Sequence, residues 1–199
     1  MTGWNRRSFL GAASLVALLS AAPGGAEVLH GLDPAEAPSP HQRTLMRTAA
    51  EHVIPTTETP GAGALGVDDF VFVALAQGLE GTRLPPAADA TFTPFLRSDG
   101  SLDHIAWLEA RLGPKWLTLP PASRHAQLAA LDAAAFSNDP AAAPWRKLKG
   151  LILTGYYTSE TGGSRELKYE LVPGRFDPKV PVTPETRAYS SDWTAVDFG

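Results

Sequence analysis

Cysteine is absent from this chain of 199 residues, and methionine occurs only twice. Without cysteine the chain has no disulfide framework, no thiolate ligand for an iron–sulfur cluster and no Cys-x-x-Cys-His site for covalent haem. It also lacks a basic stripe and an acidic tail, because the formal charge is only −4 and both signs are mixed along the sequence. We therefore expect no nucleic-acid partner and no redox cofactor ligated by this chain.

A hydrophobic run long enough to cross a bilayer is missing as well. The most apolar segment, residues 9–22, has about 14 residues, and a transmembrane helix needs about 20. The segment follows Arg6 and Arg7 and ends in small residues. Positive charge, a short apolar segment and a small-residue cleavage site form the order of an export signal, which is not part of the fold.

The arginine pair makes this signal more specific. Arg6 and Arg7 are followed by Phe9 and Leu10, and this pattern resembles a twin-arginine signal, which a receptor reads and which is not a membrane anchor. The alternative is an ordinary secretory signal with a positive start. We expect residues 1–26 to form the signal, with the mature chain starting between Pro23 and Glu27.

The rest of the sequence predicts a mainly α fold of about five helices, joined by loops rich in proline and glycine. Apolar residues recur at helical spacing in five stretches, which cover residues 40–53, 67 to about 78 or 81, 101–112, 121–135 and 144–155. A loop is expected over residues 85–100. We expect this helical domain to span residues 27–156.

Polar residues mark where several helices begin. Ser39 and Gln42 predict a capping box at the first helix, and Ser101 is the expected cap of the third. Asp68 and Asp69 are interpreted as charges that complement the N-terminal dipole of the second helix. Their side chains would point about 100° apart, so a paired acid and base is not favoured.

The sequence from residue 157 to residue 199 has no helical or strand period of its own, apart from an extended stretch expected over residues 167–172. Segments of this length without a pattern are usually functional, disordered or laid over a partner. We expect residues 157–199 to form an extended arm, rich in proline and glycine, that wraps a partner subunit.

Residues 61–66 match the dinucleotide-binding pattern Gly-x-Gly-x-x-Gly and precede a predicted helix. That pattern is meaningful when a strand leads into its first glycine, and residues 55–60 have proline at both ends and no apolar run. A glycine-rich linker between helices is the better interpretation.

Histidines and serines give little support for catalysis. His41 and His52 lie about 16 Å apart on one predicted helix, too far to share a metal ion. We expect the histidines to be solvated or locally bonded. Ser159 and Ser164 lack the Gly-x-Ser-x-Gly turn of a nucleophile.

Tyr156 and Tyr157 stand together at the end of a predicted helix, and Thr158, Ser159 and Glu160 follow them. Aromatic side chains beside a flexible polar backbone are favoured at protein interfaces. An equally good interpretation is that one tyrosine packs into the core and the other caps the loop.

Two stretches of the chain resemble the hallmarks of the gluconate 2-dehydrogenase subunit 3 family. Residues 53–62, Val-Ile-Pro-Thr-Thr-Glu-Thr-Pro-Gly-Ala, followed by Gly66 and Val67, are similar to its N-terminal motif Ile-Pro-x-Thr-(Asp/Glu)-Thr-Pro-Gly-Ala. Residues 155–160, Gly-Tyr-Tyr-Thr-Ser-Glu, and residues 167–176, Leu-Lys-Tyr-Glu-Leu-Val-Pro-Gly-Arg-Phe, are similar to its C-terminal motif. We call these stretches the N-terminal and C-terminal hallmarks.

The departures from the family pattern are small. Glu58 stands where Asp is more usual, and Phe176 stands where Tyr is common. Residues 61–66 then belong to the Thr-Pro-Gly-Ala turn. We expect the partner contact to use residues of the C-terminal hallmark, namely Tyr156, Tyr157, Thr158, Ser159, Glu160, Tyr169, Pro173 and Gly174.

The resemblance implies a small, non-catalytic subunit with no cofactor of its own. Its expected partner is a large FAD-binding dehydrogenase subunit of the glucose–methanol–choline type, which acts on a sugar, polyol or sugar acid, and a multihaem cytochrome c subunit often completes such complexes. The small subunit would support folding of the large one and escort it through the twin-arginine translocase to the membrane-associated periplasmic complex. The alternatives are a free-standing periplasmic chaperone or binding protein, and an enzyme with a non-redox site.

Overall fold

The computed structural model describes residues 32, 36–87, 89–169, 179–184 and 186–190, and this part of the chain is mainly helical. It contains five α-helices, namely α3 (Pro40–Val53), α4 (Val67–Ala76), α5 (His104–Leu112), α6 (Pro121–Phe136) and α7 (Pro144–Tyr157). The predicted fold class and the five helical stretches are therefore confirmed. The export signal residues Arg6, Arg7, Phe9 and Leu10 lie outside the described residues.

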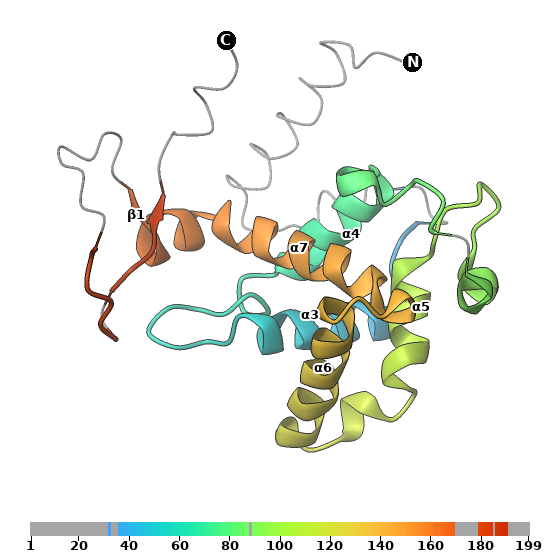
Figure 1. Cartoon of the computed structure of the whole chain (residues 1–199), viewed down its shortest axis with the longest axis horizontal. Helices are drawn as coiled ribbons and strands as arrows, with labels where there is room; N and C mark the ends of the chain where they lie inside the picture. Colours follow the sequence, from blue (N-terminus) through green and yellow to red (C-terminus); the bar gives the residue numbers. More distant parts are fainter. Residues whose placement is uncertain (1–31, 33–35, 88, 170–178, 185, 191–199) are drawn as a thin grey trace, which may run out of the picture.

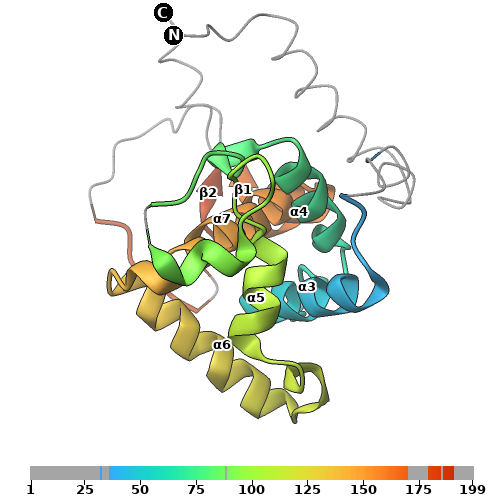
Figure 2. The same ribbon diagram turned by 90° about the vertical axis from the view of Figure 1, so that its right-hand side faces the viewer.

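Helix α7 lies through the middle of the domain and packs against the four other α-helices. Figure 1 shows α4 on one side of it and α3 and α6 on the other, and Figure 2 shows α5 beside α3. Its buried residues recur every three or four positions, as expected for a core helix: Trp145, Leu148, Leu151, Ile152 and Tyr156. Gly155 is also buried, and a Cβ there would lie 2.6 Å from Cδ1 of Phe70, so glycine lets α4 approach closely.

Two of the predicted helix starts have different outcomes. The capping box at α3 is confirmed, because the Gln42 amide donates to Ser39 Oγ and the Ser39 amide donates to Gln42 Oε1. The prediction for α5 is wrong, since its cap is Asp103, whose carboxylate accepts from the amides of Ile105 and Ala106. Ser101 instead donates its hydroxyl to Asp99 inside the preceding turn.

Short elements complete the described chain. The predicted loop over residues 85–100 contains a 3₁₀-helix, η2 (Ala90–Phe95), whose Phe92 is buried. The remaining short elements are η1 (Leu79–Gly81), η3 (Trp116–Thr118), η4 (Pro140–Ala142), the π-helix η5 (Gly162–Glu166) and the strands β1 (Lys168–Tyr169) and β2 (Tyr189–Ser190). The two strands pair in parallel.

Asp68 and Asp69 do more than complement the dipole of α4. Asp68 is 0% exposed and accepts two hydrogen bonds of 3.0 Å from the guanidinium of Arg47, whereas Asp69 accepts one of 3.3 Å from Arg43. The two arginines lie one turn apart on α3. The interpretation of these aspartates as dipole charges alone is therefore wrong, because they also join α3 to α4. Among the described residues no helix is long and apolar enough to cross a membrane.

Candidate functional site

The N-terminal hallmark forms the turn between α3 and α4, and one carboxylate organises it. Glu51, in the last turn of α3, accepts hydrogen bonds from the amide and hydroxyl of Thr56 at 2.8 and 2.7 Å. It also accepts from the amides of Gly63 and Ala64 at 3.1 and 3.2 Å. Burial opposes ionisation of Glu51, but these donors lower its pKa below the usual value. The turn is thus folded around an ionised side chain.

Two glycines make this close approach possible. A Cβ on Gly61 would lie 2.5 Å from the Thr56 nitrogen and 2.6 Å from the Ile54 oxygen. A Cβ on Gly63 would lie 2.7 Å from the Arg47 oxygen. Backbone atoms cannot yield as a flexible side chain can, so both positions need glycine. The glycine-rich segment is a linker between helices, with no strand leading into it.

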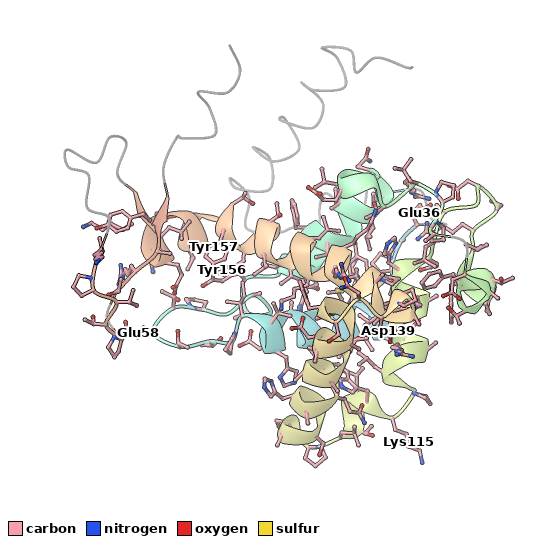
Figure 3. All side chains as sticks on the ribbon, in the orientation of Figure 1. Glu36, Glu58, Lys115, Asp139, Tyr156 and Tyr157 are labelled. Carbon is pink, nitrogen blue, oxygen red and sulfur yellow. The ribbon has the colours of Figure 1, made fainter. Side chains whose placement is uncertain are left out.

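The structure brings the two hallmarks into contact. The Tyr156 hydroxyl donates a hydrogen bond of 3.2 Å to the Pro60 carbonyl oxygen, and it lies 3.5 Å from Thr59 Oγ1. The same Thr59 hydroxyl donates to the Glu166 carboxylate at the end of η5. In Figure 3 Tyr156 and Tyr157 lie near the end of α7, and Glu58 lies on the loop that extends beyond α3. Thr59 and Pro60 therefore lie beside Tyr156 and Glu166, which are about 100 positions away in the sequence. We call the surface around these four residues the hallmark site.

The two tyrosines of the hallmark site differ in environment. Tyr156 is 1% exposed and belongs to the core, and burial raises the pKa of its phenol. Tyr157 is 40% exposed and meets the Tyr156 ring edge-on, with ring centroids 5.2 Å apart. Of the two tyrosines, only Tyr157 has an exposed side chain, while Tyr156 is buried and bonds to the N-terminal hallmark through its hydroxyl.

The chain beyond α7 is held close to it. Ser159 donates its hydroxyl to the Tyr156 carbonyl at 2.6 Å and accepts from the Gly162 amide at 3.1 Å. Thr158 donates its hydroxyl back to the Thr154 carbonyl, and Glu160 is exposed. The predicted contact residues Thr158 and Glu160 therefore lie on the surface of the hallmark site, and Ser159 shapes its backbone.

The described part of the C-terminal arm exposes apolar side chains. Val180 is 51%, Val182 85% and Tyr189 52% exposed. Strand β1, which includes Tyr169, pairs with β2, and this pairing returns the arm to the end of α7. The predicted contact residues Pro173 and Gly174 lie outside the described residues.

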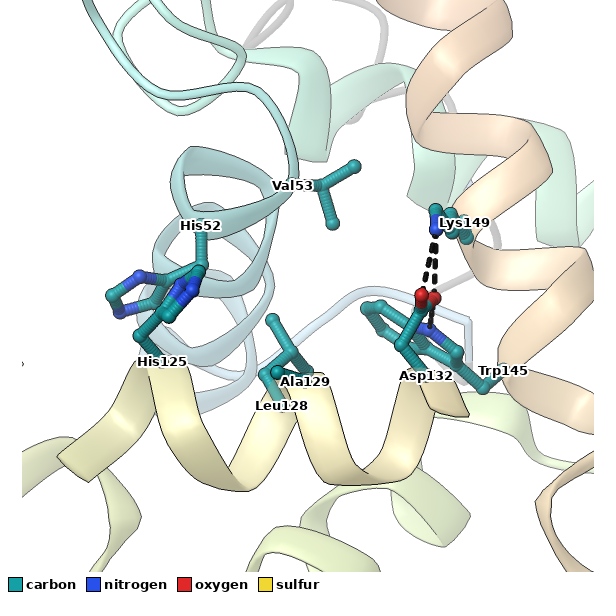
Figure 4. A pocket seen from close by; sticks show the side chains of 8 residues that line it. All are labelled: His52, Val53, His125, Leu128, Ala129, Asp132, Trp145 and Lys149. Atoms are coloured by element: carbon teal, nitrogen blue, oxygen red, sulfur yellow. Dashed lines mark hydrogen bonds and ion pairs between the residues drawn. The ribbon is translucent and has the colours of Figure 1, made fainter. Parts of the chain in front are cut away.

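A second feature is a pocket of about 150 Å³ between α3, α6 and α7, drawn in Figure 4. His52 and His125 stand at one end with ring centroids 5.8 Å apart, and burial lowers the pKa of His52. At the other end the Asp132 carboxylate accepts from Lys149 Nζ at 2.8 Å and from Trp145 Nε1 at 2.7 Å. This histidine pair has no signal in the sequence, because His52 is on α3 and His125 is on α6.

The polar groups at the Asp132 end of the pocket satisfy one another. Asp132, Lys149 and Trp145 form a closed set of hydrogen bonds. A group of three or more histidine, aspartate or glutamate side chains that could hold a metal ion is not found in the described parts of the chain. The hallmark site, which unites two distant motifs, is therefore the stronger candidate for function.

Comparison with known proteins gives one result. Residues 40–174 match the family of gluconate 2-dehydrogenase subunit 3, and this range covers more than half of the 199 residues. No curated protein and no solved structure matches the chain. The matched range begins at the first residue of α3, and it includes the N-terminal hallmark and all of the C-terminal hallmark except its last two residues, Arg175 and Phe176. The chain therefore belongs to the gluconate 2-dehydrogenase subunit 3 family, and it is an accessory subunit of a dehydrogenase complex.

Proposed function

We propose that this chain is the non-catalytic small subunit of a periplasmic, membrane-associated dehydrogenase that oxidises a sugar, polyol or sugar acid. The catalytic partner is a large FAD-binding subunit of the glucose–methanol–choline type, and a multihaem cytochrome c subunit accepts the electrons. The FAD belongs to the large subunit. This chain supports folding of that subunit and escorts it through the twin-arginine translocase.

The observation that carries the proposal is the meeting of the two hallmarks in one place. Thr59 and Pro60 from the first hallmark bond with Tyr156 from the second. The result is a surface held together by hydrogen bonds, with Tyr157 and Glu58 exposed upon it. A preorganised surface loses little entropy on association, which favours a lasting partner.

The C-terminal arm supplies the second part of the contact. Val180, Val182 and Tyr189 expose more than half of their surface to solvent. Apolar side chains on an arm gain stability when a partner covers them. We propose that the arm leaves the helical domain at the hallmark site and lies across the large subunit.

The escort role is tested by changing the export signal. Replacement of Arg6 and Arg7 by lysine keeps the charge and removes the paired guanidinium groups. We expect both this chain and its flavoprotein to stay in the cytoplasm, as measured by fractionation and flavin content. Arg111→Lys, on the exposed face of α5, is the matched control and should leave export intact. Arrival of the flavoprotein in the periplasm with the lysine pair would exclude escort by this chain.

The partner contact is tested by co-purification. Tyr157→Ala should lower the yield of flavoprotein recovered with this chain, because it removes an exposed aromatic side chain at the hallmark site. Phe136→Ala is the control, since Phe136 is 58% exposed and lies at the end of α6. A free-standing chaperone or binding protein would yield no flavoprotein from native membranes with either variant or with the unchanged chain.

A further inference from the structure

Two described residues that precede α3, Leu32 and Glu36, contact the helical domain. The side chain of Leu32 packs against the core. The Glu36 carboxylate forms an ion pair of 2.6 Å with Arg83 and a second with Arg97. Burial disfavours the charge, but the two arginines lower the pKa of Glu36. We call Glu36, Arg83 and Arg97 the anchor cluster.

The anchor cluster stands where α4 ends and α5 begins. Arg83 also donates to the Ala76 carbonyl at the end of α4, and Arg97 lies 3.8 Å from Asp103, the cap of α5. A pocket of about 110 Å³ beside Glu36 is lined by residues of the same two helices, among them Leu75 and Ile105. Leu32 and Glu36 are therefore part of the packed domain.

The anchor cluster and the hallmark site lie at opposite ends of one helix. The anchor cluster meets the chain just before α3 starts at Pro40, and the N-terminal hallmark begins where α3 ends at Val53. A helix of this length rises about 20 Å from its first residue to its last. In Figure 3 Glu36 lies toward one end of the domain, and Glu58 and Tyr157 lie toward the other.

We infer that the anchor cluster fixes the departure point of the export signal at the end of the domain remote from the dehydrogenase, so that the signal stays accessible after the partner has bound. This inference rests on the proposed function and adds a spatial order to it. The hallmark site holds the partner, α3 serves as the spacer, and the anchor cluster holds the entering chain. Assembly can then precede export, because neither contact covers the other.

The absence of cysteine makes a direct test possible. Ala37→Cys places one thiol beside the anchor cluster, and Thr57→Cys places one at the hallmark site; both positions are exposed. Each variant is purified in complex with its flavoprotein and as the free chain, and both forms are treated with a biotin maleimide. The labelling of this chain is then measured by mass spectrometry, separately from that of the partner.

We expect assembly to slow labelling at position 57 by more than about tenfold, because interface cores exclude solvent. At position 37 the rates of the free and assembled chains should agree within about twofold, as for a surface that no partner covers. Strong protection of position 37 would overturn the inference. If assembly slowed labelling at position 57 no more than at position 37, the inference would also be overturned, because the hallmark site would not be the covered end. Failure to recover any complex with the unchanged chain would instead reject the proposed function.

The anchoring itself is tested with Glu36→Gln, which removes the charge that the two arginines share. We expect faster limited proteolysis within residues 32–38 and an unchanged yield of flavoprotein on co-purification. Glu80→Gln is the matched control, because its side chain is exposed and forms no ion pair within the described part of the chain. Unchanged proteolysis, or a loss of flavoprotein as large as that of Tyr157→Ala, would show that Glu36 is not a remote anchor.

Discussion

Tyr156 and Pro60 are 96 residues apart in the sequence, and the hydroxyl of the first donates a hydrogen bond of 3.2 Å to the carbonyl of the second. This bond joins the last turn of α7 to the loop that follows α3. It lets a core residue fix the shape of an exposed surface. The consequences can be measured on the folded chain and on the complex.

The first prediction concerns this bond. Tyr156→Phe keeps the buried ring and removes the hydroxyl, so the free energy of unfolding should fall by about 1 kcal/mol. Urea denaturation measures this change. Tyr157→Phe is the control, and it should change stability by less than about 0.5 kcal/mol, because the side chain of Tyr157 is 40% exposed and its ring is kept. An equal effect of the two variants would contradict an internal role for Tyr156. Tyr156→Ala is a poor test of partner binding, since it would also open a cavity in the core and cost about 3–5 kcal/mol.

The second prediction concerns Glu51, whose carboxylate accepts four hydrogen bonds from the turn. Because its donors lower its pKa, ionised Glu51 stabilises the fold above its ordinary value of 4.5, and this stability is lost as the pH falls through the lower folded value. Glu51→Gln should therefore lower the free energy of unfolding at pH 7 and reduce its fall on acidification. Thermal denaturation at several pH values measures both effects. Glu58→Gln, at an exposed position of the same loop, should alter neither quantity.

The third prediction compares the replacement of two glycines, Gly162 and Gly150, by alanine. A Cβ on Gly162 would overlap the Tyr156 carbonyl, whereas a Cβ on Gly150, within α7, would meet nothing within 4 Å. Gly162→Ala should destabilise the fold by about 2 kcal/mol through steric conflict. Gly150→Ala should stabilise it by about 0.5–1 kcal/mol, because alanine favours the helix. The two substitutions should therefore shift the melting temperature in opposite directions. A lower melting temperature for Gly150→Ala would mean that α7 is more crowded at this position.

The fourth prediction uses His104, which is 5% exposed and has Nδ1 3.0 Å from the Leu102 carbonyl oxygen. Burial lowers the pKa of His104 from 6.5 to about 4, and nearby Lys147 acts in the same direction. Between those values the unfolded chain binds more protons than the folded one, so stability falls as the pH decreases through this window. A shift of this size corresponds to about 3 kcal/mol. His104→Asn keeps a donor for Leu102 and should flatten the dependence of stability on pH, as measured in urea titrations.

The helix boundaries that could be predicted from the sequence are those set by local chemistry. Ser39 with Gln42 and a proline at the first helical position define the start of α3, and prolines likewise begin α6 and α7. The start of α5 could not be chosen locally, because Ser101 and Asp103 are both good caps. The hydrogen bond from Ser101 to Asp99 decides between them, and it depends on the geometry of a turn.

The candidate site was predictable in its members and not in its arrangement. The hallmarks could be found from their residues, but the hydrogen bond between Thr59 and Glu166 spans 107 positions and has no local signal. The same limit applies to Asp68, whose partner Arg47 is on another helix. For Tyr156 and Tyr157 the sequence left two interpretations open. Packing of α7 against its neighbours decides which ring is buried.

The turn around Glu51 explains why the sequence looks like a phosphate-binding loop. Successive amides in such glycine-rich turns form a concave nest that attracts anions. Here the amides of Gly63 and Ala64 already point at a carboxylate, supplied by the helix that precedes them. The loop is thus an anion-binding nest that is already occupied by a carboxylate of the same chain. Truncation of Glu51 to alanine would leave the nest empty, so that formate or acetate could bind there.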